Sequence, residues 1–203
     1  MSRLVFITGA SSGIGQALAW QFYQAGYSLA LVARRTAQIQ SWIDERDIAP
    51  ERCRVYGADV SITDHIVAAG QDCLESQGLP DVVIACAGIS VGVDTAEPQD
   101  IEIIARTFAI NNTGTAATFH PFVRAMVKRG SGVLVGISSV NGIRGFPNNL
   151  TNFTVSTGGS GGTGPGSRSH PANPIKRGIN PESNSVKNFS PIPYFFILQP
   201  LPG

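Results

Sequence analysis

Short apolar runs alternate with longer segments of helical periodicity over the first 147 residues. The runs predict five strands, at Leu4–Thr8, Ser28–Ala33, Arg54–Gly57, Asp81–Ala87 and Gly132–Ser138. The fourth run is continuously apolar after its first residue, as expected for a strand buried on both faces. Strands that alternate with helices are typical of a parallel α/β sheet. We therefore expect one domain over residues 1–147.

Apolar residues at spacings of three and four predict the helices between these strands. The predicted helices are about Gly13–Ala25, a helix that ends before Pro50, about Thr63–Ser76 and about Pro98–Lys128. The first helix has Ile14 on its apolar face and Gly26 as its terminating glycine. Ser61 or Thr63 is expected to cap the third. The fourth is expected to be interrupted near Asn111–Gly114.

Five strands joined by right-handed crossovers predict an open, doubly wound α/β sheet of the Rossmann-like kind, truncated after the fifth strand. Such a sheet binds ligands at the carboxyl ends of its strands, around the point where the strand order reverses. Candidate site residues should therefore follow the predicted strands directly.

The end of the chain differs in composition from the rest. Residues 151–203 hold eight of the 13 prolines, eight of the 23 glycines and one acidic residue, Glu182. The glycine run Gly158–Gly166 is unsuited to the interior of a helix or central strand, and the apolar stretch Ile192–Leu198 is short. We expect residues 148–203 to be an irregular Gly-, Pro- and Ser-rich tail outside the fold. The apolar fifth strand would then be an unpaired edge.

Charge and cysteine usage exclude several classes of protein. Lys plus Arg number 15 and Asp plus Glu 14, a formal net charge of +1 that argues against a nucleic-acid partner. Cys53, Cys73 and Cys86 form no CxxC pair and the histidines lack ligand spacing, so we expect free thiols and no metal site. No apolar run approaches the roughly 18 residues of a membrane span, and no secretory cleavage site follows the N-terminus. A cytoplasmic protein is expected.

A glycine-rich turn, Thr8–Gly15, joins the first strand to the first helix with the sequence Thr-Gly-Ala-Ser-Ser-Gly-Ile-Gly. Glycines let the backbone turn sharply and approach an anion, and a helix N-terminus attracts negative charge. The alternative is an ordinary turn with helix-capping serines. The position of the turn in the first strand–helix unit favours a binding site for dinucleotide phosphates.

This turn resembles the Thr-Gly-x-x-x-Gly-x-Gly hallmark of the short-chain dehydrogenase/reductase family, and further segments over residues 3–147 resemble the family in the same order. Asp59-Val60 resembles the pair that contacts adenine. Ala87-Gly88 matches the end of an Asn-Asn-Ala-Gly motif, in which Ala85 and Cys86 replace the asparagines. Asn111-x-x-Gly114 resembles the segment whose asparagine holds a proton-relay water, and Ser139 matches the catalytic serine.

The resemblance implies a dinucleotide-binding domain with catalytic residues Ser139 and Asn111. With the two arginines discussed next, the expected cofactor-binding residues are Gly9, Ser11, Ser12, Gly13, Ile14, Arg34, Arg35, Asp59, Val60, Ala87 and Gly88. The implied substrate is a small-molecule carbonyl or secondary alcohol. A homo-oligomer is possible for the family but is not expected here.

Arg34 and Arg35 follow the second strand, and no Asp or Glu lies between Tyr27 and Ile43. An acidic residue in this region would bind the ribose 2′-hydroxyl of NAD, whereas an arginine accommodates the 2′-phosphate of NADP. Adjacent guanidinium groups make charge-assisted contacts to phosphate. A solvated basic start to the next helix is the alternative. We expect NADP as the cofactor.

The family's catalytic Tyr-x-x-x-Lys pair is absent from the chain. Its members use a lysine one helical turn after a tyrosine to lower the tyrosine's pKa. The residues four positions after the four tyrosines are Tyr27, Leu31, Val60 and Leu198. The sequence leaves three hypotheses: an NADP-dependent oxidoreductase, a non-catalytic NADP-binding module, or a truncated product that folds poorly. The missing pair favours the second or third for this chain.

Overall fold

The structure, a computed structural model, describes residues 3–93, 97–138 and 194–198 of the chain. Its strands are β1 (Leu4–Thr8), β2 (Ser28–Ala33), β3 (Cys53–Gly57), β4 (Val82–Ala85), β5 (Val133–Ser138) and β6 (Tyr194–Leu198). The first five lie within two residues of the predicted strand limits. The parallel α/β prediction is confirmed for these five strands.

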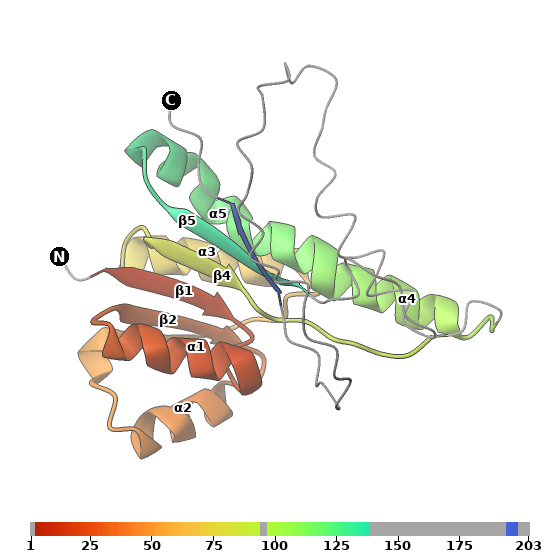
Figure 1. Ribbon diagram of the computed structural model, residues 1–203, viewed down its shortest axis with the longest axis horizontal. Coiled ribbons are helices and arrows are strands. Elements are labelled where there is room, and N and C mark those ends of the chain that lie inside the picture. The colour runs from red at the N-terminus through yellow and green to blue at the C-terminus, as the bar shows by residue number, and fades with distance from the viewer. Residues whose placement is uncertain (1–2, 94–96, 139–193, 199–203) are drawn as a thin grey trace, which may run out of the picture.

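All six strands form one sheet with the order β3-β2-β1-β4-β5-β6. Pairing is parallel from β3 through to β5. The chain winds outward from β1 to β3 and then crosses back to β4, so the strand order reverses between β1 and β4 (Figure 1). This reversal is where a doubly wound sheet binds ligands.

Helices cover both faces of the sheet (Figure 1). They are α1 (Gly13–Gln24), α2 (Thr36–Glu45), α3 (Thr63–Ser76), α4 (Asp100–Phe108) and α5 (Gly114–Arg129), with a 3₁₀ turn η1 (Pro50–Arg52) and a π-helical turn η2 (Ala109–Thr113). On one face, β1, β2, β4 and β5 pack against α1 and α2, with Leu29, Leu31 and Ile39 fully buried. On the other, Phe6 packs against Phe122 of α5 and Ile66 of α3. The site therefore lies on a sheet that is buried on both sides.

Local signals fix most element ends, and three details differ from the predictions. Gly26 ends α1 as predicted, with φ +87° and the paired bonds of a Schellman motif. Ile14 is 41% exposed rather than in the core. Ile62, not Ser61 or Thr63, is the N-cap of α3. The predicted interruption is a π turn, η2, between α4 and α5, whose backbone stays helical at both junctions.

The prediction that β5 is an unpaired edge is wrong. β6 pairs with it in antiparallel register, from Leu134↔Leu198 to Ser138↔Tyr194. Residues 194–198 of the expected irregular tail therefore form a strand of the sheet. A short Tyr-Phe-Phe-Ile-Leu segment has high β propensity, and an unpaired edge offers it a row of backbone hydrogen bonds. The domain boundary at residue 147 lies outside the described residues and stays a prediction.

The helices that the structure describes include none with both the length and the apolarity needed to cross a bilayer.

Candidate cofactor site

A pocket with a cavity volume of about 260 Å³ lies at the carboxyl ends of the parallel strands, beside the reversal of strand order. Residues that follow β1, β2, β3 and β4 all contribute to its wall. Ten of the eleven predicted cofactor-binding residues line the pocket: Gly9, Ser11, Ser12, Ile14, Arg34, Arg35, Asp59, Val60, Ala87 and Gly88. The eleventh, Gly13, is the first residue of α1 and does not line it. The fold thus brings together residues that are spread over 80 positions of sequence.

The turn after β1 is so tightly packed that side chains are excluded from two of its positions. Gly9 has φ +71°, and a Cβ there would lie 2.8 Å from both the nitrogen and the Cα of Ala87. A Cβ on Gly15 would collide with the carbonyl oxygen of Gly9. Glycine therefore lets the turn approach the end of β4 closely. The result is a backbone-lined cradle open to the pocket.

The serines of this turn do not make the capping bond that the ordinary-turn alternative requires. Ser12 is the N-cap of α1, but its side chain makes no capping hydrogen bond. Ser11, Ser12 and Ile14 line the pocket. The partial exposure of Ile14 follows from this position, because its side chain borders the cavity rather than the core.

Arg34 and Asp59 lie close together on the pocket wall. Nη1 of Arg34 is 3.6 Å from Oδ2 of Asp59, and their side chains are 57% and 26% exposed. The other carboxylate oxygen, Oδ1, accepts hydrogen bonds from the backbone nitrogen of Ser61 at 2.9 Å and from its hydroxyl at 2.7 Å. Partial desolvation opposes ionisation of Asp59, but the Ser61 bonds and the Arg34 charge together outweigh it and lower its pKa. The wall therefore carries an ionised acid beside Arg34, and Arg35 lines the same pocket.

Asn111 connects the π turn to the loop after β4. Its Oδ1 accepts a hydrogen bond from the nitrogen of Ile89 at 2.9 Å, and its Nδ2 donates to the carbonyl of Ile89 at 2.8 Å. Its own carbonyl accepts a bond from the Thr115 hydroxyl at 2.7 Å. The side-chain amide thus holds the loop that forms one pocket wall. The role of Asn111 in catalysis stays a prediction.

The spacing of Asn111 and Gly114 has a packing reason. A Cβ on Gly114 would lie 2.8 Å from the carbonyl oxygen of Val60, a pocket-lining residue. Gly114 thus lets α5 approach the loop after β3, while Asn111 reaches the loop after β4. The π turn holds Asn111 and the first residue of α5 is Gly114, so both contacts come from one short segment. Such turns are common at functional sites.

Ala87 and Gly88 line the pocket where β4 ends, and Cys86 precedes them. The hydroxyl oxygen of Thr8 accepts hydrogen bonds from the nitrogens of Cys86 at 3.2 Å and Ala87 at 3.4 Å, which ties the end of β1 to this loop. Burial raises the pKa of the Cys86 thiol to about 11, so it stays protonated near neutral pH. At this position the pocket wall has a small, weakly polar side chain instead of an amide.

Sequence reasoning missed the apolar part of the pocket. Ala58, Ile89, Ile110 and Ile137 line it as well. Ala58 and Ile89 come shortly after β3 and β4, and Ile137 lies in the last two residues of β5. Their positions at strand ends could therefore have indicated them. Ile110 belongs to η2 and offered no such signal. Ser139, the predicted catalytic serine, lies outside the described residues.

Cys53, Cys73 and Cys86 are free thiols, as expected. Within residues 3–93 and 97–138, the structure groups no three His, Cys, Asp or Glu side chains closely enough to hold a metal ion.

Comparison with known proteins gives a consistent result. The sequence profile of the family described as short chain dehydrogenase matches residues 3–153. A Drosophila melanogaster protein named dehydrogenase/reductase SDR family protein 7-like is 34% identical over 149 residues, which are 71% of this chain and 45% of that protein. An uncharacterized oxidoreductase of Myxococcus xanthus is 34% identical over 144 residues, which are 71% of this chain and 56% of that protein. The chain spans about half the length of these relatives.

Solved structures agree with the sequence matches. A short-chain dehydrogenase from Streptomyces avermitilis superposes with a TM-score of 0.72 at 27% identity, covering 78% of this chain and 58% of that one. An alcohol dehydrogenase from the archaeon Thermococcus sibiricus, solved in complex with 5-hydroxy-NADP, has a TM-score of 0.70 at 25% identity over 77% of this chain and 66% of that one.

Proposed function

The chain belongs to the short-chain dehydrogenase family, and on this premise we propose that its pocket binds NADP without turning over a substrate. One observation carries the proposal: the glycine cradle and two arginines lie on the walls of a single pocket beside the reversal of strand order. The cradle suits a diphosphate, since backbone nitrogens and a helix N-terminus attract anions. We expect this NADP-binding protein to be cytoplasmic and to bind neither nucleic acid nor metal.

The residues present fit a dinucleotide phosphate. A Cβ at Gly9 would collide with the backbone of Ala87 and one at Gly15 with the backbone of Gly9, so the compact turn that lines the pocket requires both glycines. Arg34 and Arg35 would hold the 2′-phosphate through charge-assisted bonds. No Asp or Glu lies between Tyr27 and Ile43, so this segment has no acid to bind the ribose 2′-hydroxyl of NAD. Asp59 and Val60 would contact the adenine, by resemblance to the family.

Catalysis would need more than these residues provide. When bound, NADP supplies hydride transfer between its nicotinamide and a carbonyl or secondary alcohol. Asn111 would act by positioning the loop after β4 through its two hydrogen bonds to Ile89. Ser139 would orient a substrate oxygen. The sequence places no lysine four residues after any tyrosine, so no acid of the family's kind is available to move the proton. An active oxidoreductase is the second candidate, favoured only by family membership.

Two measurements on the full chain separate these candidates. Titration calorimetry should detect NADPH binding that is tighter than NADH binding. A panel of aldehydes and ketones should then cause no NADPH oxidation above background. Sustained oxidation that Ser139→Ala abolishes would establish the active enzyme instead, and absence of NADPH binding would refute both.

A further inference from the structure

The two neighbours of β5 pair with different parts of it. β4 pairs in parallel with β5 from Val133 to Gly136. β6 pairs in antiparallel register with β5 from Leu134 to Ser138. Among the described strands, only β6 therefore pairs with Ile137 and Ser138. The carboxyl end of β5 depends on β6 for its ladder.

This end of β5 belongs to the cofactor pocket. Ile137 lines the cavity together with Ile89 and Ile110, and it also packs against the core on the α1 and α2 face. In the register it lies opposite Phe195 of β6. Ser138 pairs with Tyr194 and directly precedes Ser139, the predicted catalytic serine. β6, which does not line the pocket, thus pairs with the part of β5 that holds the wall residue Ile137.

β6 follows β5 in the chain by more than 50 residues, and among the described strands it is the one that runs antiparallel to the other five. It lies at one edge of the sheet, and β3 lies at the other; Figure 1 shows β6, in blue, beside β5. Edge strands open at lower free energy than central strands, because they have a neighbour on one side. As one of the two edge strands, β6 is therefore exchanged between docked and undocked states more readily than the central strands are.

We propose that docking of β6 on β5 increases the affinity of the pocket for NADP, by holding Ile137 and Ser138 in the sheet. The edge of β5 is in this view a binding site for an extended apolar strand, which the chain fills with its own Tyr194–Leu198. This inference rests on the proposed function. Coupling between two sites is reciprocal, so bound NADP in turn stabilises the docked strand.

A disulfide across the two strands tests the coupling. Gly136 lies opposite Phe196, and a Cβ on Gly136 meets no described atom within 4 Å, so Gly136→Cys is sterically tolerated. The double variant Gly136→Cys/Phe196→Cys should crosslink on oxidation. Its matched control, Gly136→Cys/Leu198→Cys, is out of register and should crosslink far less, because Leu198 lies opposite Leu134. Burial keeps the native thiols protonated and slow to react, with pKa values of about 11 to 12.

The readout is NADPH affinity by calorimetry before and after reduction of the crosslinked full-length protein. The locked form should bind NADPH more tightly than the reduced form, by on the order of fivefold. Equal affinities would overturn the coupling, and equal crosslinking of the matched and out-of-register pairs would overturn the docking. If no form binds NADPH, the proposed function fails together with the coupling, while the crosslinking yield still reports whether β6 docks.

A second pair of variants needs no disulfide. Phe196→Pro fixes φ and removes a backbone N–H from β6, which disfavours strand pairing, whereas Phe196→Thr keeps a good strand former at the same position. The proline variant should show faster amide exchange at Ile137 and Ser138 and several-fold weaker NADPH binding than the threonine variant. Unchanged exchange and affinity in the proline variant would overturn the proposal.

Discussion

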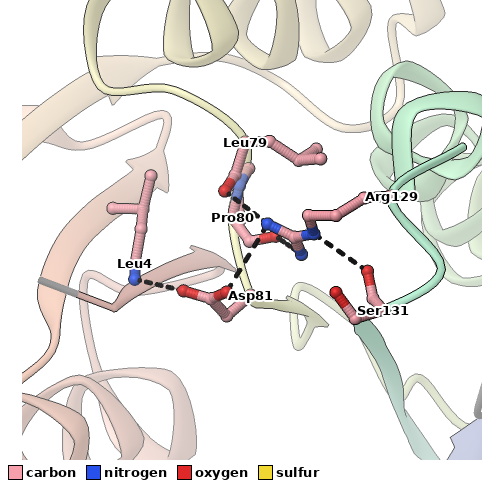
Figure 2. A network of polar contacts seen from close by, with 6 residues as sticks. All are labelled: Leu4, Leu79, Pro80, Asp81, Arg129 and Ser131. Atoms are coloured by element: carbon pink, nitrogen blue, oxygen red, sulfur yellow. Dashed lines mark hydrogen bonds and ion pairs between the residues drawn. The ribbon is translucent and has the colours of Figure 1, made fainter. Parts of the chain in front are cut away.

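Nη1 of Arg129 lies 3.5 Å from Oδ1 of Asp81, where the last turn of α5 meets the amino end of β4 (Figure 2). The other carboxylate oxygen of Asp81 accepts a hydrogen bond from the nitrogen of Leu4 at 2.9 Å. The pair thus links α5, β4 and the first residue of β1. It lies at the opposite end of the strands from the candidate cofactor pocket, so it bears on stability rather than on binding.

Substitution of Arg129 should destabilise the fold. Its guanidinium also donates hydrogen bonds to three carbonyls, those of Leu79, Pro80 and Ser131. Because the side chain is 30% exposed, water replaces part of what is lost, and we expect Arg129→Met to lower the free energy of unfolding by about 1–3 kcal/mol. Urea denaturation measures this change.

Arg124→Met is the matched control, since Arg124 is exposed on the same helix, and it should change stability by less than about 0.5 kcal/mol. Arg129→Lys keeps the charge but loses the planar fork, so it should retain most of the destabilisation. Equal stability of the methionine variants would show that the network contributes nothing measurable.

Asn111→Ala should loosen the loop after β4. The substitution removes both hydrogen bonds to Ile89, at a cost of about 1–3 kcal/mol in unfolding free energy. Amide exchange at Ile89 should accelerate, and NADPH binding should weaken because this loop forms a pocket wall. Thr113 is an exposed position of the same π turn. Thr113→Ala should leave the free energy of unfolding, the exchange rate of Ile89 and the affinity for NADPH unchanged. An unaltered Ile89 exchange rate in Asn111→Ala would contradict the assignment.

The double variant Arg34→Ala/Arg35→Ala should discriminate between the cofactors. Loss of charge-assisted bonds to the 2′-phosphate should weaken NADP binding by about 2–4 kcal/mol, whereas NAD binding should change little. Calorimetry on both cofactors measures the difference. Arg46→Ala, an exposed arginine just after α2, serves as the control for net charge. An equal loss for NAD and NADP would refute the assignment of these two residues.

Ser61→Ala should raise the pKa of Asp59 toward its ordinary value of 3.8, because it removes one of the bonds that favour the carboxylate. A lowered pKa stabilises the folded state at pH values above the unfolded-state pKa, and this contribution is lost as pH falls through the folded-state pKa. The stability difference between wild type and variant should therefore shrink in acid, below about pH 4. Carbon-detected NMR titration of Asp59 gives the pKa directly. Ser11→Ala should leave it unchanged, and no shift in Ser61→Ala would contradict the argument.

The local order of the chain could be predicted from the sequence. β1 and β2 have the predicted limits, and α3 runs from Thr63 to Ser76 as expected, because strand alternation and helical periodicity depend on near neighbours. The glycine-rich turn Thr8–Gly15 could be predicted as well, since its glycines and the strand and helix that it joins lie within one short segment. Ten of the predicted binding residues line one pocket for a related reason: in a parallel sheet, residues after successive strands meet at one edge.

Contacts between distant segments were decided by the tertiary structure. Arg34 pairs with Asp59, and Asn111 bonds to the backbone of Ile89. No local pattern in the sequence relates the two members of either pair. The exposure of Ile14 depends on the pocket beside it, not on the periodicity of its helix.

The sequence by itself determined five parallel strands, the helices between them and the turn that shapes the candidate cofactor site. Only the tertiary structure decided that Tyr194–Leu198 joins the sheet. A five-residue apolar strand has no preference for a partner or a direction until an edge with unpaired backbone groups is present. That edge exists only once β5 has paired with β4, and so the fate of the last strand depends on the assembled sheet.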